Sequence, residues 1–371
     1  MPTDPNDPQS LPRTTAVIDE WAATGHHIGA QVYVSIDAKP IADFALGLAR
    51  PAIGDAAPVP MTRDTLMLWL SASKPFAAVA LAQLREKALL DFDDPVVKFI
   101  PEFAAHGKDR ITLTHLLTHT AGLRFIELGW PETPWDQIVA TICAAQIEPG
   151  WIVGEKAGYS PFASWFILAE VVQRLDPGRR TYSDYCRDEI FLPLRMTDTW
   201  LAMPPERYRD YGDRIGVMMN TYKKPMEPAG LDTEVAAANC RPSGGGRGPA
   251  WQLGRFYEGL LSSAILQPAS LEKLITPHRV GLFDHTFRST MDWSLGFNTN
   301  SSRYGPDTVP YGYGTSAGPR AFGHGGAQST CAFADPDRGL VAVITWNGQC
   351  GEPSHHRRLK ATLVALENDI G

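Results

Sequence analysis

Along the first fifty residues, apolar and polar positions follow two different periods. Residues 11–23 repeat their apolar side chains at helical spacing, so we expect a helix there. Residues 28–36 and 41–48 alternate between apolar and polar side chains, and the turn-like Asp37-Ala-Lys-Pro40 joins them. This pattern predicts two neighbouring strands in a hairpin, and therefore an antiparallel sheet that begins early in the chain.

Helical spacing dominates the next part of the chain, to about residue 240. Helices are expected at 94–100, 113–119, 135–145, 161–175, 182–191 and 251–261. The last third returns to strands, expected at 293–298, 321–323, 330–334 and 340–346, before a final helix at 358–367. Strands near both ends with helices between them predict a mixed α/β protein. Residues 1–75 and 240–371 would form a discontinuous sheet domain, and residues 76–239 a mostly helical domain.

The longest apolar helical stretch starts directly after Ser71. An apolar run ends in Ser71-Ala-Ser-Lys74, and Phe76, Val79 and Leu84 then recur on one side. Lys74 lies one turn after Ser71, on the same face, near the helix N-terminus. Apolar surroundings lower the pKa of a lysine, so Lys74 can accept the Ser71 proton near neutral pH. A nucleophilic serine beside its own base is therefore expected, with the helix N-terminus favouring an oxyanion.

The same spacing occurs a second time, in Ser270-Leu-Glu-Lys273. There the serine follows Gln-Pro-Ala, which is typical of the N-cap of a surface helix. The motif alone is therefore a weak indicator of catalysis, and the rest of the chain has to distinguish the two serines.

Composition narrows the range of functions. The chain has 371 residues, of which 44% are hydrophobic and 20% charged, enough for a sizeable core in one or two domains. Its net charge is −7 and its basic residues do not cluster, so nucleic acid is not expected as a partner. The N-terminus lacks a signal-peptide pattern, no apolar run is long enough for a membrane span, and the five cysteines are scattered. We therefore expect a cytoplasmic protein with reduced thiols and no membrane partner.

Two further segments carry candidate chemistry. Tyr159 precedes the helical stretch 161–175, where a phenol can point into a cleft, and a cationic lysine nearby would lower its pKa and make it a general base. Ala321-Phe-Gly-His324-Gly-Gly-Ala327 is typical of a glycine-rich edge strand that lets a ligand approach backbone N–H groups. Structural interpretations stay open for both segments, namely a packed aromatic and a bulged strand with a surface histidine.

Three other motifs suggest competing functions. Gly314-Thr-Ser316-Ala-Gly318 fits a nucleophile elbow, but loop-like residues flank it instead of a strand and a helix. His115 and His119 have metal-ligand spacing on a helix, although no third ligand is evident, so two locally bonded histidines are expected. The glycine-rich segment 242–249 lacks the ending of a phosphate loop and is expected to be a flexible loop.

Together, these segments resemble the serine β-lactamase-like family, which includes class C β-lactamases, D-alanyl-D-alanine peptidases and the family VIII type of carboxylesterase. Ser71-Ala-Ser-Lys74 resembles the nucleophile motif, Tyr159-Ser-Pro161 lies where the family has Tyr-x-Asn, and His324-Gly-Gly326 lies where it has Lys-Thr-Gly or His-x-Gly. Segments 91–101, 111–123 and 191–199 resemble linking parts of the family. The resemblance implies a β-lactamase-like fold, with an antiparallel sheet flanked by helices, a mostly helical domain and an active site between them.

The resemblance also implies a role for each matching residue. Ser71 would attack the substrate carbonyl. Lys74 and Tyr159 would handle the serine proton and later protonate the leaving group. The amides of Ser71 and Ala327 would form the oxyanion hole. The residues of the substrate-binding strand would be His324, Gly325 and Gly326.

Two departures from the lactamase pattern favour esters over β-lactams. Pro161 has no side-chain donor or acceptor, so the contact that Asn makes there with the substrate amide and with Lys74 is expected to be lost. His324, which would orient Tyr159 or the substrate, replaces a permanently charged lysine and attracts a substrate carboxylate less.

We therefore predict a serine carboxylesterase that acts on a small-molecule ester or amide without a cofactor or metal. An amidase, D-peptidase, β-lactamase or acyltransferase on the same site is an alternative within enzymes. A catalytically inactive binding homologue is the alternative from another class. The sequence leaves open the acyl and alcohol specificity and whether the chain forms a homo-oligomer.

Overall fold

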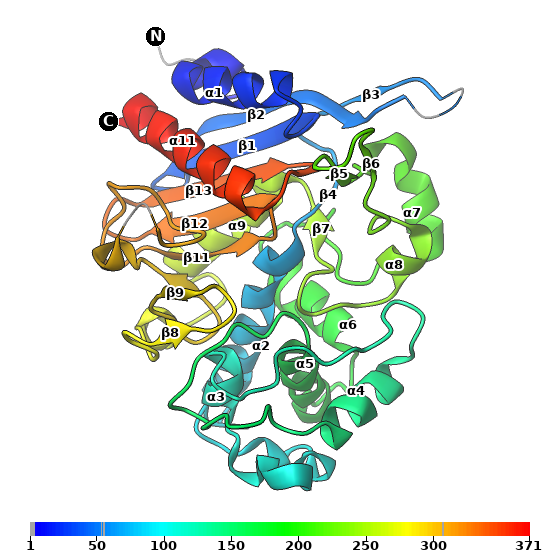
Figure 1. Cartoon of the computed structure of the whole chain (residues 1–371), viewed down its shortest axis with the longest axis vertical. Helices are drawn as coiled ribbons and strands as arrows, with labels where there is room; N and C mark the ends of the chain where they lie inside the picture. The colour runs from blue at the N-terminus through cyan, green and yellow to red at the C-terminus, as the bar shows by residue number, and fades with distance from the viewer. Residues whose placement is uncertain (1–3, 53, 55, 306–307) are drawn as a thin grey trace.

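The computed structural model describes residues 4–52, 54, 56–305 and 308–371, and its central element is a seven-stranded antiparallel sheet (Figure 1). The strand order is β10, β11, β12, β13, β1, β2 and β3. Their bounds, in that order, are Asn298–Thr299, Phe322–Gly326, Thr330–Asp335, Leu340–Trp346, Gly29–Ile36, Lys39–Arg50 and Val59–Pro60. Because β1 pairs with β13, strands from both ends of the chain meet in the middle of the sheet.

The predicted N-terminal hairpin is present as β1 and β2, which pair in antiparallel register. Its turn is shorter than expected, because only Asp37 and Ala38 lie between the strands. Both residues have a left-handed backbone, with φ of 49° and 57°. Two such residues in succession match the tight turn whose twist suits a strand pair.

Helices cover both faces of the sheet (Figure 1). On one face, α1 (Pro12–Ala23) packs against α11 (Glu352–Ile370). On the other face lies α9 (Ala250–Leu261), where Gly254 leaves room for Tyr33, since a Cβ at Gly254 would come within 2.2 Å of the tyrosine ring. The buried side chains between the sheet and the helices α1 and α11 include Ile18, Val32, Ile344 and Leu363. Because both faces are covered, β1 and β13 are apolar along most of their length.

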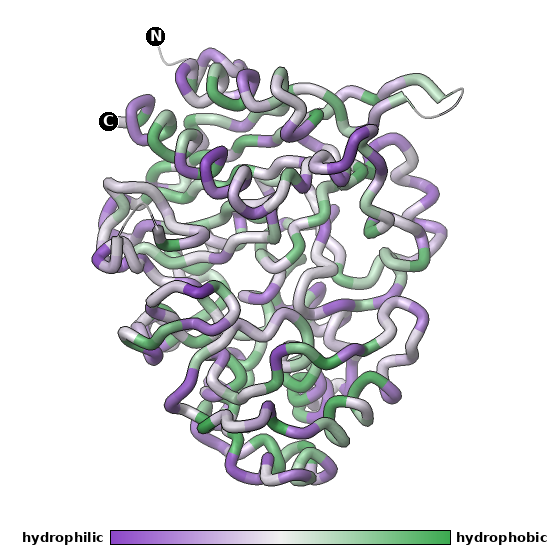
Figure 2. The backbone as a smooth tube through the Cα atoms, in the orientation of Figure 1, coloured by the Kyte–Doolittle hydropathy of each residue, from purple (hydrophilic) through white to green (hydrophobic). Residues whose placement is uncertain are grey.

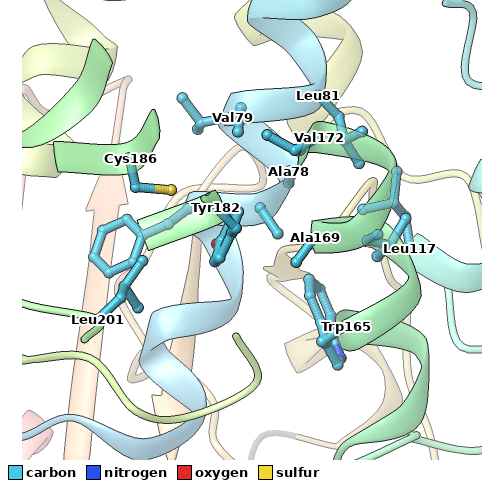
Figure 3. Close-up of a cluster of buried hydrophobic side chains, with 14 of the residues drawn as sticks. Ala78, Val79, Leu81, Leu117, Trp165, Ala169, Val172, Tyr182, Cys186 and Leu201 are labelled. Atoms are coloured by element: carbon cyan, nitrogen blue, oxygen red, sulfur yellow. The ribbon is translucent and has the colours of Figure 1, made fainter. Parts of the chain in front are cut away.

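The helices of the middle segment pack around α2 (Lys74–Glu86) and α5 (Ala163–Leu175), at the far end of the molecule from α1 (Figure 1). The α2 helix is buried from Lys74 to Leu84, which explains why it is apolar on all sides. Ala78 and Ala169 lie where α2 and α5 approach each other, and larger side chains fill the space around them (Figure 3). Hydrophilic residues are frequent along the outer helices α1 and α11 (Figure 2).

The other described elements are short. The helices are α3 (Leu113–Leu117), α4 (Trp135–Ala144), α6 (Tyr182–Cys186), α7 (Pro205–Tyr211), α8 (Glu234–Ala238) and α10 (Pro268–Ile275). The small sheets are β4 (Met67–Leu68) with β7 (Arg247–Gly248), β5 (Met219–Asn220) with β6 (Glu227–Pro228) and β14 (Gly348–Gln349), and β8 (Phe283–Asp284) with β9 (Ser289–Thr290). Within the described ranges, no helix has both the length and the apolar character that crossing a membrane requires.

The mixed α/β class is confirmed, but two predicted elements are wrong. Residues 293–298 do not form a strand, because Gly296, with φ of 85°, turns the chain and leaves only β10 at the end of the segment. Residues 94–100 do not form an α-helix. They contain a single 3₁₀ turn, Val96–Lys98, preceded by an extended proline.

Two other interpretations need comment. Ser270 is not the N-cap of its helix, because it lies inside α10, whose N-cap is Gln267. The division into domains at residues 75 and 240 stays a prediction. The largest cluster of buried side chains contains residues of both parts, such as Phe76 of α2 and Val343 of β13.

The packing around α2 predicts a large stability difference between two leucine substitutions. Leu81 is fully buried in the cluster of Figure 3, so Leu81→Ala should lower the free energy of unfolding by about 2–5 kcal/mol. Leu192 is 43% exposed, so Leu192→Ala should change it by no more than about 0.5 kcal/mol. Urea unfolding followed by circular dichroism measures both, and equal effects of the two substitutions would contradict the packing.

Candidate active site

Ser71 lies in a 3₁₀ turn, Leu70–Ser73, that leads directly into α2. Leu70 has a left-handed backbone, with φ of 49°, which is uncommon for a residue with a side chain and typical of strained functional turns. The Ser71 side chain is half-buried, and Lys74 is the first residue of α2. The serine therefore lies near the N-terminus of the apolar helix, as predicted.

Hydrogen bonds fix this turn to the glycine-rich segment that follows residue 240. Ser73 Oγ donates to the carbonyl of Leu70 at 2.7 Å and accepts from the N–H of Gly246 at 3.0 Å. A Cβ at Gly246 would lie 2.5 Å from Ser73 Oγ, so only glycine allows this approach. Residues 241–250 are all buried. The expectation of a flexible loop at 242–249 is therefore wrong, because the loop packs beneath the serine turn.

Lys74 is fully buried, and its Nζ has three oxygen neighbours. These are Ser71 Oγ at 3.0 Å, the carbonyl of Pro161 at 3.0 Å and the carbonyl of Ser243 at 2.7 Å. Burial lowers the pKa of the Lys74 amine well below its ordinary value, and the positive charge of Arg241 lowers it further. This lowering of the Lys74 pKa agrees with the expectation from the apolar sequence around the residue.

In its neutral form Lys74 has a lone pair, and the three oxygen neighbours of Nζ fix the direction in which it points. A carbonyl oxygen can only accept, so Pro161 and Ser243 each take one N–H of the amine. A neutral amine has two hydrogens and one lone pair. The lone pair is therefore left for the third neighbour, the Ser71 hydroxyl. In this arrangement the serine donates and the lysine accepts, which is the geometry that a general base requires.

Tyr159 is 7% exposed and packs beside the lysine, whose Nζ lies 5.0 Å from the centre of its ring. Burial raises the pKa of the Tyr159 hydroxyl well above its ordinary value, and the neighbouring Ser71 side chain only partly offsets this effect. The expectation that a cationic lysine would lower this pKa is wrong, because the buried Lys74 amine is itself driven toward its neutral form. A protonated phenol at this position can donate a proton.

Pro161 contacts Lys74 through its main chain instead of its side chain. Its side chain has no polar atom, but its backbone carbonyl accepts a hydrogen bond from Lys74 Nζ. The side-chain contact is absent, as expected, and the main chain provides an acceptor for Lys74 in its place. The proline side chain still offers no donor to a substrate amide.

His324 lies on β11 and is buried. Its Nδ1 lies 2.7 Å from the carbonyl of Gly325, so Nδ1 carries the hydrogen and Nε2 is an acceptor. Burial, and then the charge of Lys74, lower the pKa of His324 to about 3, so the ring is neutral. The rings of His324 and Tyr159 are 6.1 Å apart. Whether His324 orients Tyr159 or the substrate stays a prediction.

The two glycines after His324 allow neighbouring residues to approach β11 closely. A Cβ at Gly325 would lie 2.4 Å from the ring of Tyr311, and one at Gly326 would lie 2.2 Å from the carbonyl of Trp69. Gly326 thus brings β11 against the residue that precedes the serine turn. Ala327 follows the strand and lines the same cavity as Ser71.

A cavity of about 460 Å³ joins these groups. Ser71, Tyr159, His324 and Ala327 line one part of it. Its wall also includes residues that the sequence analysis missed, namely Thr286, Phe287, Trp293, Asn298 and Tyr311. Several of these side chains are aromatic, so the cavity suits an apolar group next to the serine. Sequence periodicity placed Trp293 in a regular strand, which hid its position on the wall.

His119 is a second residue that the sequence analysis misjudged. His115 bonds locally as predicted, since its Nδ1 accepts the N–H of Thr112 at 3.1 Å. His119 Nδ1 instead accepts the N–H of Ser160, 41 residues away, at 3.0 Å. Its ring centre lies 4.6 Å from that of Tyr159. Over the described part of the chain, no group of three or more His, Cys, Asp or Glu side chains could hold a metal ion.

The competing nucleophile Ser316 lies in a loop on the surface, with neither a strand before it nor a helix directly after it. Its N–H donates to Glu367 at 2.7 Å, and its Oγ accepts from Arg338 at 3.2 Å. An elbow needs the opposite setting, a sharp turn between a strand and a helix. The geometry therefore favours Ser71 as the nucleophile candidate.

The site and the fold can now be compared with known proteins. Residues 14–367 match the family model described as Beta-lactamase. The chain belongs to the beta-lactamase family. Penicillin-binding proteins, beta-lactamases and esterases are all among the relatives that match, so membership indicates an enzyme of this family without naming its substrate.

The similar proteins differ in how much of each chain is matched. Penicillin-binding protein 4* of Bacillus subtilis is 27% identical over 66% of this chain and 54% of its own length. Esterase EstB of Burkholderia gladioli is 32% identical over 34% of this chain and 32% of its own. A penicillin-binding protein homologue from Caulobacter crescentus has a structure that covers 98% of this chain and 100% of its own, with 26% identity and a TM-score of 0.78. The chain spans about half the length of the first curated relatives it matches.

The state of Lys74 in this beta-lactamase-family site predicts a pH profile. A base must be deprotonated to act, so kcat/KM for an ester should rise with pH through the pKa of Lys74 and then level off. Because burial lowers that pKa well below 10.5, the rise should be complete well before an exposed lysine would titrate. His324, with a pKa of about 3, should add no step between pH 5 and 9. Activity that appears only above about pH 10 would show that Lys74 is charged at neutral pH.

Proposed function

We propose that this protein is a serine hydrolase that cleaves carboxylic esters through an acyl-enzyme on Ser71. The observation that carries the proposal is the position of Lys74 Nζ, which lies 3.0 Å from Ser71 Oγ and is held there by two backbone carbonyls. The aromatic residues on the wall of the adjoining cavity, Tyr159, Phe287, Trp293 and Tyr311, support a substrate with an apolar group.

In the proposed acylation step, Lys74 takes the proton of Ser71 while Oγ attacks the ester carbonyl carbon. The carbonyl oxygen becomes an oxyanion between the N–H groups of Ser71 and Ala327. When the tetrahedral intermediate collapses, the phenol of Tyr159 protonates the departing alcohol. Protonated Lys74 then returns a proton to Tyr159, so the acyl-enzyme starts the next step with a neutral amine and a neutral phenol. In the second step Lys74 takes a proton from water, whose oxygen attacks the acyl carbonyl carbon. Tyr159 then protonates Ser71 Oγ as it leaves, and the acid is released.

Two features favour an ester over a β-lactam. A β-lactam carries a carboxylate, and a lysine would attract it where this chain has the neutral ring of His324. The lactam amide also needs a side-chain partner, which Pro161 does not provide. The similarity to an esterase such as EstB is consistent with this choice. An amidase, peptidase or acyltransferase would use the same acyl-enzyme, and the substrate panel below separates them from an esterase.

Substitution of the candidate serines tests the nucleophile. Ser71→Ala should abolish labelling by a fluorophosphonate probe and lower ester hydrolysis roughly 10³-fold or more, because no acyl-enzyme can form. Ser316→Ala is the matched control, since Ser316 lies in a surface loop, and it should keep most of the activity. Mass spectrometry of the labelled peptide locates the probe. A probe attached to Ser316, or no labelling of the wild type, would sink the assignment.

Substrate preference tests the ester. Losing one hydrogen bond to a charged group costs about 1.5–3 kcal/mol, or roughly 10- to 150-fold in rate, before any effect on deacylation. We therefore expect higher kcat/KM for p-nitrophenyl acetate or butyrate than for nitrocefin under the same conditions. A p-nitroanilide of the same acyl group reports on amidase activity. An equal or higher value for nitrocefin would favour the lactamase, and a higher value for the anilide would favour the amidase.

A further inference from the structure

The turn at residues 158–161 carries both Tyr159 and the Pro161 carbonyl that holds Lys74, and one buried carboxylate fixes its backbone. Both oxygens of Asp284 lie 3.1 Å from the N–H of Tyr159. The same carboxylate accepts the N–H groups of Thr286 at 2.9 Å and Phe287 at 3.0 Å. The Thr286 hydroxyl donates to the carbonyl of Tyr159 at 3.0 Å. Asp284 therefore ties the tyrosine turn to the loop after β8.

Arg279 forms an ion pair with the same carboxylate. Its guanidinium lies 3.0 Å from Asp284, and the side chains of the pair are 1% and 0% exposed. The same guanidinium donates to the carbonyl of Thr118 at 3.1 Å. The next residue along the chain, His119, accepts the N–H of Ser160. Three separate segments, 118–119, 158–160 and 279–287, are thus joined around the turn.

Elementary electrostatics argues against stability as the main role of this buried ion pair. Taking two charges out of water costs as much as their mutual attraction returns, so a buried pair is weak evidence for stability. Its hydrogen bonds do have fixed directions, and the carboxylate uses its acceptor capacity on backbone N–H groups of two segments. Such a pair defines position more than it adds stability.

We propose that Asp284 and Arg279 are positioning residues for the hydrolytic machinery. Their ion pair holds the turn 158–161 so that the Tyr159 side chain faces the nucleophile. The inference rests on the proposed roles of Ser71 and Tyr159, but it does not depend on an ester being the natural substrate. A positioning error of about 1 Å in such a site can cost roughly 100-fold in rate.

A double-mutant cycle with Tyr159→Phe distinguishes positioning from a general structural role. Asp284→Asn keeps the size of the side chain and one acceptor oxygen but removes the charge that pairs with Arg279. We expect it to lower kcat for an ester with a poor leaving group, such as ethyl butyrate, about 10- to 100-fold, because the alkoxide must take the Tyr159 proton as it leaves, with KM changed less than about threefold. In the Tyr159→Phe background the same substitution should cost less than about threefold, because the positioned group is already gone.

Asp176→Asn is the matched control. Asp176 is also a buried carboxylate that accepts a backbone N–H, that of Arg180 at 2.9 Å, and pairs with the guanidinium of that arginine, but at the far end of α5. It should lower the melting temperature while changing kcat for the same ester less than about threefold in either background. If Asp284→Asn costs the same factor with and without the Tyr159 hydroxyl, or if the folded variant keeps its rate within about twofold, the positioning role is refuted.

Arg279→Lys covers the case in which Asp284→Asn does not fold. It keeps the positive charge but removes the planar guanidinium, whose Nη1 bonds both Asp284 and the Thr118 carbonyl. The same cycle applies, with an expected loss of about three- to tenfold that largely disappears in the Tyr159→Phe background. Additive losses would again refute the role. A wild type that is labelled at Ser71 but hydrolyses no ester would contradict the proposed substrate alone, and the cycle is then run on the p-nitroanilide, whose departing amine also needs a proton.

Discussion

The site depends on a lysine that has no contact with water. An ammonium ion in an apolar interior is costly, so the amine at Lys74 moves toward its neutral form and gains a lone pair. That neutral amine still needs partners, and it has three, from the serine turn, the tyrosine turn and the segment after residue 240. The chemistry of the site therefore follows from bringing three distant segments to within 3 Å of one nitrogen.

The fold meets this requirement through close backbone contacts. The α2 helix carries Lys74 into the interior because it is apolar on every side, and the 3₁₀ turn before it places Ser71 beside the cavity. Gly246 lets the segment after residue 240 lie under the serine turn, and Gly326 lets β11 lie against the residue before that turn. A side chain at either glycine would push a strand or loop away from the nucleophile. Strand β11 and the segment beside Lys74 are thus placed by the absence of side chains at these two glycines.

Protonation states in the site form a consistent set. His119 accepts a backbone N–H through Nδ1, whereas His324 donates to a carbonyl through Nδ1, and burial lowers the pKa of both rings. The two histidines are therefore opposite tautomers and carry no charge. The charged groups that are buried nearby, Asp284 and Arg279, neutralise each other. At the position of His324 the cavity therefore presents a neutral ring, and the charged residues on its wall, Arg288 and Glu352, have opposite signs.

The sequence by itself determined the features that depend on neighbouring residues. Periodicity predicted the N-terminal hairpin, the apolar helix after Ser71 and the mixed α/β class, because side-chain patterns report which face of an element is buried. The order of short motifs indicated Ser71, Lys74 and Tyr159 as candidates. Only the tertiary structure decided how these groups are held. His119 bonds 41 residues along the chain and Asp284 lies 125 residues from Tyr159, and a pattern with a period of two to four residues carries no information about such pairs.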